Sequence, residues 1–218
     1  ENLFQYEKIE KNNDNAEKKV NKTQTYTNQL GYAKAQINNM FIVSQTDDSL
    51  ILIDQHAAHE RIVLENLKKN YKKRKILKQV LLLPEIVNID EGKLLLLKNK
   101  KAISELGFEF DDYGENSIIV REIPAILGKI NIDSLFQDLK EQINVLGEIN
   151  PEDSGIERIL SSIACHNSVR AGKKLNIEEM NSILRLMEKT PNSSQCNHGR
   201  PTFVELRLKD VEALFGRT

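Results

Sequence analysis

The chain has 218 residues, 39% hydrophobic and 29% charged, which is typical of a globular protein with a sizeable core. Lys and Arg total 31 and Asp and Glu 32, so the net charge is -1 and binding to nucleic acid requires a local positive patch. The longest apolar runs, such as residues 94–97, are too short to span a bilayer, which excludes a membrane protein. Only two cysteines and no apolar leader predict reduced thiols in the cytoplasm.

The N-terminal segment is predicted to lie outside the folded part. Residues 1–5, ENLFQ, resemble a protease-site scar, and residues 7–28 are mostly Lys, Asn, Glu, Gln and Thr. Such a composition cannot offset the entropy lost on ordering. We therefore assign residues 1–29 to a tag scar and flexible linker, and expect the chain to be a fragment of a longer protein.

The next segment predicts a β-hairpin followed by a helix. Two β-rich runs, 41–45 and 49–54, flank the polar turn 46–48. From residue 55 to about 71 the apolar residues have helical spacing, and Asp54 is a suitable N-cap. A basic run, residues 68–78, ends this helix.

The remaining pattern alternates strands and helices. Strands are predicted at 86–89, 108–110, 117–123 and 202–208, and helices at 92–106, 134–146, 156–171, 177–189 and after residue 208. A hairpin near one end and a strand near the other, with helix-rich material between them, predict a discontinuous domain that carries an insertion.

The most informative segment for chemistry is 54–65, DQHAAHERIVLE. His56 and Glu60 are four residues apart, so they share one face of the helix just beyond Asp54, and this spacing can hold a divalent metal. The alternative is structural: Asp54 caps the helix, Glu60 pairs with a nearby cation and His56 is polar surface.

Two further segments contain potential metal ligands. In 195–201, QCNHGRP, Cys196 and His198 are two residues apart on a loop, and in 164–172, ACHNSVRAG, Cys165 lies on a predicted helix. Cys-x-His is structural about as often as metal-binding, and Cys165 alone is typical of a small buried hydrophobe. Together with Asp54 and its neighbours, these residues form a mixed set that favours zinc over magnesium or calcium.

These three segments, in this order, resemble the C-terminal domain of endonuclease-type MutL mismatch-repair proteins, over residue 31 to the end. The chain departs from the common pattern at Asn197, usually Pro, and at His166, often Lys or Arg. The resemblance implies an α+β fold: a discontinuous α/β dimerisation subdomain, residues 30–78 and 156–218, with an inserted mixed α/β regulatory subdomain, residues 79–155.

The resemblance also implies the activity, a metal-dependent endonuclease that nicks one strand of duplex DNA. Asp54 and Glu60 are the implied catalytic residues, and Glu65, which closes the first segment, is a less certain ligand. Zn²⁺ is expected in a structural or regulatory role and Mn²⁺ in catalysis. The implied metal ligands are Asp54, His56, Glu60, Cys165, Cys196 and His198. The alternative is a non-catalytic dimerisation and docking module in which zinc only joins the loops.

The implied partners are a second copy of the chain, duplex DNA, the replication sliding clamp and, through the full-length protein, a mismatch-recognition protein at the nucleoid. In 79–84, QVLLLP, Gln79 would anchor the clamp contact, Leu82 would fill a pocket and Pro84 would limit the ordering entropy. An ordinary buried strand is the alternative. The residues predicted to contact DNA phosphates are Lys72, Lys73, Arg74 and Lys75, unless they form only a solvated helix end.

Overall fold

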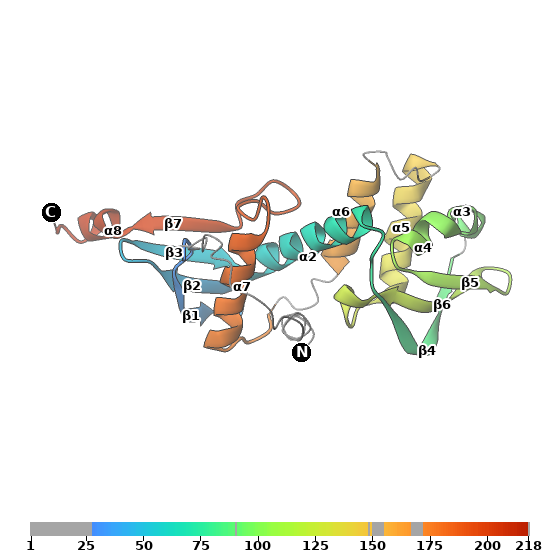
Figure 1. Cartoon of the computed structure of the whole chain (residues 1–218), viewed down its shortest axis with the longest axis horizontal. Coiled ribbons are helices and arrows are strands. Elements are labelled where there is room, and N and C mark those ends of the chain that lie inside the picture. Colours follow the sequence, from blue (N-terminus) through green and yellow to red (C-terminus); the bar gives the residue numbers. More distant parts are fainter. Residues whose placement is uncertain (1–27, 90, 148, 150–154, 167–171, 218) are drawn as a thin grey trace, which may run out of the picture.

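A four-stranded antiparallel sheet joins segments from the two ends of the chain (Figure 1). The computed structural model describes residues 28–89, 91–147, 149, 155–166 and 172–217, so most of the predicted linker lies outside the described residues. The sheet has the order β1-β2-β3-β7, with β1 Tyr32–Ile37, β2 Phe41–Gln45, β3 Ser49–Asp54 and β7 Phe203–Arg207. The predicted hairpin is confirmed, and pairing of β3 with β7 makes this unit discontinuous in sequence.

Helix α2, Gln55–Lys72, starts where β3 ends. One carboxylate oxygen of Asp54 accepts hydrogen bonds from the backbone N–H groups of His56 and Ala57, both at 3.0 Å, which confirms the predicted N-cap. Ala58 and Ile62 pack in a first core with helix α7, Ile177–Lys189, under the four-stranded sheet. The opposite side of α2 contributes Val63, Leu64 and Leu67 to a second core.

The second core lies on a three-stranded antiparallel sheet of order β4-β6-β5. Its strands are β4 Lys78–Asn88, β5 Glu109–Tyr113 and β6 Ser117–Pro124. Phe136 lies between Phe108 and Phe110 in edge-to-face contacts, with ring centroids 5.7 and 5.5 Å apart. The packing helices are α5 Ile132–Leu146 and α6 Gly155–His166, with the short helices α3 Lys93–Lys98, α4 Lys100–Glu105 and η1 Ala125–Leu127 alongside. A last helix, α8 Leu208–Leu214, follows β7.

The α+β class is confirmed, and four details differ from the expectations. The predicted helix 92–106 is broken at Asn99, whose buried side chain binds backbone groups of Leu95, Gly147 and Ile149. Strand β1 was not predicted, because its sequence YAKAQI has few strand-forming residues. The strand predicted at 86–89 is longer and starts earlier, as β4 Lys78–Asn88. Helix α6 packs its apolar face in the second core, although it was assigned to the discontinuous subdomain, and predicted positions 167–171 lie outside the described residues.

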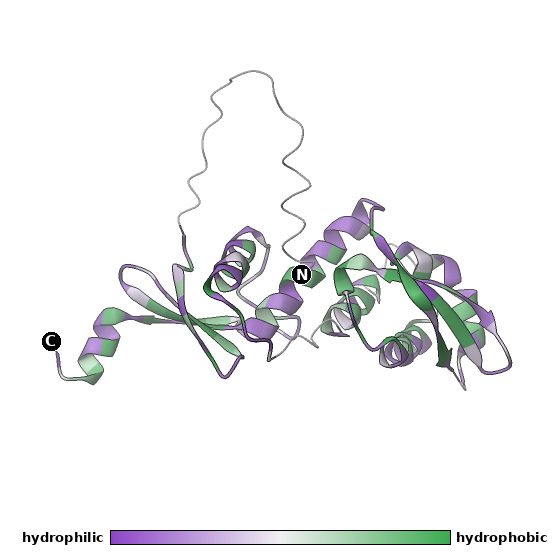
Figure 2. Ribbon diagram, turned by 90° about the horizontal axis from the view of Figure 1, so that it is seen from below, coloured by the Kyte–Doolittle hydropathy of each residue, from purple (hydrophilic) through white to green (hydrophobic). Residues whose placement is uncertain are grey.

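The molecule is elongated, with the two sheets at opposite ends and α2 running between them (Figure 1). Figure 2 shows hydrophobic stretches along the strands of both sheets, whereas α2 is hydrophilic over much of its length. Among the described residues, no helix is both long and apolar enough to cross a bilayer. The hydrophilic helix α2 contains most of the polar segment 54–65 and lies between the two sheets.

Candidate metal and nuclease site

The first group of candidate ligands lies at the β3–α2 junction. His56 Nε2 is 3.2 Å from Glu60 Oε1, so the predicted sharing of one helical face is confirmed. Glu60 is buried at 6% exposure, whereas His56 is partly exposed. Because one Asp54 oxygen already accepts two backbone hydrogen bonds, that carboxylate is fixed in place at the start of the helix.

Cys165, near the end of α6, faces this helix. Helices α2 and α6 pack against each other, and the Cys165 thiol interacts with the Glu60 carboxylate. Burial, followed by the negative charge of Glu60, raises the pKa of the thiol to about 11. The loop that carries Cys196 also reaches this thiol, because Asn197 Nδ2 lies 3.8 Å from Cys165 Sγ. Two segments that are more than 100 residues apart in the chain therefore meet.

The third group lies on a tight loop before β7. Gln195 and Pro201 form an isolated antiparallel bridge, and the Cys196 N–H donates to the Arg200 carbonyl at 2.7 Å. The Gly199 N–H closes a turn onto the Cys196 carbonyl at 3.0 Å, and Gly199 has a φ of 79°, which favours glycine. Cys196 is buried, and its sulfur lies 3.4 Å from the His198 backbone nitrogen.

Asn197 connects this loop to α6. Its Nδ2 group is 3.8 Å from Cys165 Sγ, a contact that proline, the common residue at this position, has no donor to make. Its Oδ1 atom is buried and has no hydrogen-bond partner. A buried amide oxygen of this kind favours a further polar group as its partner.

The donor chemistry fits zinc, although the ligands are not yet arranged around one point. Within the described part of the chain, no group of three His, Cys, Asp or Glu residues is already placed to hold one metal ion. Glu60 on α2, Cys165 on α6 and the Cys196 loop lie at one junction, whereas His198 is exposed and meets Cys196 only through its backbone. Zinc binding therefore requires the thiols to lose their protons and side chains such as His198 to turn inward.

Two polar residues near the site have other partners. His166 Nε2 is 2.6 Å from Asp138 Oδ2 on α5, a helix that packs on the three-stranded sheet, so this nitrogen already has a partner. Glu65 binds Arg61 at 3.0 Å. Arg61 itself was missed in the sequence, although it directly follows Glu60 and precedes Glu65 by one helical turn.

The predicted clamp-binding segment is exposed. The pairing of β4 with β6 shifts between Val80 and Glu85, so residues 81–84 bulge out of the ladder at the edge of the sheet. Leu82 is 97% exposed and Leu83 is 78% exposed, while Gln79 and Pro84 are also on the surface. The alternative of an ordinary buried strand is therefore wrong.

The predicted DNA-contact residues are exposed at the end of α2. They are Lys72, Lys73, Arg74 and Lys75. The rest of the basic run is partly neutralised, because Lys68 lies 3.2 Å from Glu157 and Lys78 pairs with Glu109. The positive patch is thus centred on residues 72–75.

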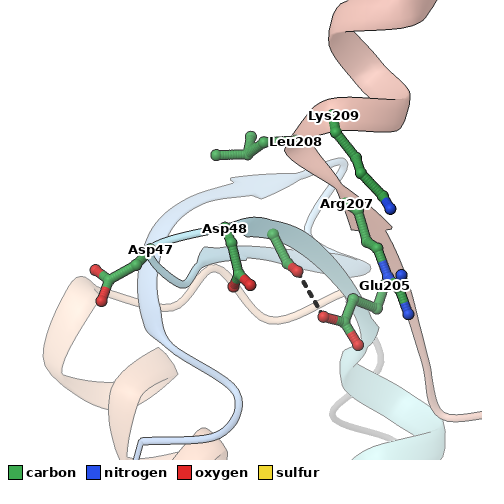
Figure 3. Close-up of a pocket in the computed structure, with 7 residues that line it drawn as sticks. Asp47, Asp48, Glu205, Arg207, Leu208 and Lys209 are labelled. Atoms are coloured by element: carbon green, nitrogen blue, oxygen red, sulfur yellow. Dashed lines mark hydrogen bonds between the residues drawn. The ribbon is translucent and has the colours of Figure 1, made fainter.

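A pocket of about 550 Å³ lies at the opposite end of β3 from Asp54 (Figure 3). Its lining includes Asp47, Arg207 and Lys209, and Ser49 donates a hydrogen bond of 2.5 Å to Glu205. Its lining contains none of the predicted metal ligands. The candidate metal site lies instead where α2, α6 and the loop before β7 meet.

Comparisons with known proteins identify the family of the chain. Residues 34–175 match the family model of the MutL C-terminal dimerisation domain. The chain belongs to this MutL family. It is 50% identical over 190 residues to the DNA mismatch repair protein MutL of Rickettsia bellii (strain OSU 85-389), which covers 86% of this chain. It is 49% identical over 189 residues to the MutL of Bradyrhizobium sp. (strain ORS 278), with the same coverage. The chain spans 31% of the length of each of these MutL relatives.

Proposed function

We propose that this MutL-family chain is a metal-dependent endonuclease and dimerisation unit that nicks one strand of duplex DNA during mismatch repair. The observation that carries the proposal is the meeting of Glu60, Cys165 and the Cys196 loop at one junction. These groups come from three segments that are distant in the sequence, namely α2, α6 and the loop before β7. A buried carboxylate beside two thiols is chemistry that a zinc ion satisfies.

The residues divide the work as follows. Glu60, Cys165, Cys196 and His198 would hold zinc, while Asp54, His56 and Glu60 would hold manganese, which would polarise the scissile phosphate and lower the pKa of the attacking water. Lys72, Lys73, Arg74 and Lys75 are the exposed cations that bind backbone phosphates without reading sequence. The capping bonds to Asp54 keep its carboxylate at a constant position relative to Glu60.

Zinc binding is the first test, because it requires neither DNA nor tethering to another protein. Elemental analysis and calorimetry under reducing conditions are expected to show stoichiometric zinc in the wild type. Binding should be lost in Cys196→Ser and in His198→Ala. A wild type that binds neither zinc nor manganese would refute the metal site.

Asp54→Asn tests catalysis with little cost to folding, because asparagine caps helices as well as aspartate does. Manganese-dependent nicking of supercoiled plasmid is expected to disappear in this variant while zinc binding remains. Asp47→Asn, in the turn at the other end of β3, is the matched control and should nick normally. Equal nicking by Asp54→Asn and the wild type would favour the docking-module alternative.

The four-stranded sheet supports pairing with a second copy. One face packs on α2 and α7, while cross-strand neighbours on the other face are also apolar: Phe41, Val43, Leu50, Leu52, Val204 and Leu206. None of these six side chains belongs to either described core. An apolar face of this kind is typical of an interface. Sedimentation is expected to show a dimer, and a monomer at micromolar concentration would contradict it.

The exposed bulge of β4 supports docking to the sliding clamp. Leu82 projects from an edge strand whose ladder is already interrupted, so it can enter a pocket without unfolding the sheet. Leu82→Ala is expected to abolish binding to the clamp in surface plasmon resonance. Leu94→Ala, at an 82% exposed leucine of the same unit, is the matched control.

A further inference from the structure

The Arg61 guanidinium is bound on three sides. Its Nε donates to the Gln195 carbonyl at 2.7 Å and one terminal nitrogen donates to the Cys196 carbonyl at 2.8 Å. The other terminal nitrogen donates to Glu65 Oε1 at 3.0 Å. The side chain is only 11% exposed, and its hydrogen bonds to Cys196 and Glu65 are partly buried.

The two carbonyls belong to consecutive residues of the Cys196 loop. The planar fork of arginine matches two neighbouring acceptors, a geometry that the single ammonium of lysine does not reproduce. The Cys196 carbonyl also accepts the Gly199 N–H that closes the turn toward His198. Arg61 therefore fixes the backbone of Cys196, and this backbone determines where the Cys196 sulfur and the His198 side chain lie.

Glu65 accepts the guanidinium hydrogen bond that does not go to the loop. It lies one helical turn after Arg61, is 15% exposed and has Lys68 at 3.9 Å as a further neighbour. Lys68 also pairs with Glu157 on α6, the helix that carries Cys165. The carboxylate of Glu65 thus faces the arginine and not the thiols.

We infer that Arg61, oriented by Glu65, is the positioning residue that fixes the Cys196–His198 loop against α2, and that Glu65 has this supporting role and is not a metal ligand. The link to metal rests on the proposed function, whereas the link to the loop does not. Arg61 lies next to Glu60 in the helix, so one turn of α2 supplies both a ligand and the group that places the opposing ligands.

Two measurements separate these links. The first is hydrogen exchange of the metal-free protein at the Cys196, Gly199 and Thr202 amides, which are bonded within or next to the loop. Arg61→Lys is expected to speed exchange there by about tenfold or more, the factor for losing a hydrogen bond to a charged group. Glu65→Gln should give a smaller increase in the same amides.

The second measurement is the zinc dissociation constant by calorimetry. Arg61→Lys is expected to weaken zinc by about 10- to 100-fold, as for other residues that orient metal ligands, with the stoichiometry unchanged. Glu65→Gln should weaken zinc less and leave the stoichiometry unchanged, whereas a lost ion would show that Glu65 is a ligand.

Arg185→Lys is the matched control. Arg185 likewise donates to a backbone carbonyl, that of Gly31 at 2.6 Å, and pairs with Glu188 at 3.0 Å, but on α7. Its variant should leave loop exchange and zinc affinity unchanged.

Unchanged loop exchange in Arg61→Lys would overturn the inference. Faster exchange with unchanged zinc affinity would overturn its link to the metal. A wild type without zinc would refute the proposed metal site, and loop exchange would still decide the role of Arg61.

Discussion

The two sheets of this molecule differ in how they use their faces. The three-stranded sheet comes from one continuous stretch of chain and packs on helices around a closed aromatic core. The four-stranded sheet takes its last strand from the far end of the chain and leaves an apolar face outside both cores. The three-stranded sheet and its core therefore stabilise the single chain. The four-stranded sheet instead has one buried face and one apolar face that a second copy can cover.

The largest expected effect is on the closed core. Phe136→Ala removes the ring that contacts both Phe108 and Phe110, and should lower the free energy of unfolding by about 3–5 kcal/mol. Thermal or urea unfolding measures the loss, and Phe136→Leu should lose less. The dimer should persist in both variants at temperatures where they are folded. Dissociation without unfolding would break the proposed division between the two units.

The open face predicts the opposite pattern. Val204→Glu places a charge on the apolar face of β7 and should weaken dimerisation by about 2 kcal/mol, roughly 30-fold, because burying an unpaired charge is costly. Sedimentation over a concentration series measures the constant. Val145→Glu, at a 78% exposed residue of α5, is the control. If both variants behave alike, the interface lies elsewhere.

A third prediction concerns the ties within the second unit. Asn99→Ala leaves the Ile149 N–H without its acceptor, which now lies at 2.9 Å, and should lower the free energy of unfolding by about 1–2 kcal/mol. Urea unfolding measures this change. Ser134→Ala, at an exposed position of α5, should have little effect.

The last prediction concerns the pH dependence of stability at the junction. Burial and Glu60 raise the pKa of Cys165 from its ordinary value of 9.0 to about 11, so the folded state holds this proton more tightly. The stabilising contribution is complete below pH 9 and is lost as the pH rises toward 11. The metal-free wild type should therefore lose stability over this range, and Cys165→Ala should lose less. For the same reason zinc affinity should increase with pH, since binding releases the thiol proton.

Much of the fold could be predicted from local patterns. The alternation in 41–54 and the helical spacing of α2 and α7 lie within single elements, so they were visible in the sequence. Strand β1 and the break at Asn99 were not, because each depends on contacts with distant parts of the chain, such as Ile149. The exposed bulge at residues 81–84 depends likewise on its register against β6.

The sequence by itself determined the candidate ligands and their order, because residue identity and the helical spacing of His56 and Glu60 are local properties. It also marked Asp54 as a cap. Only the tertiary structure decided that Cys165 meets Glu60, that Asn197 reaches Cys165 and that Arg61 holds the Cys196 loop. These contacts join residues that are 32 to 135 positions apart, and their distances follow from how the helices pack and not from any local pattern.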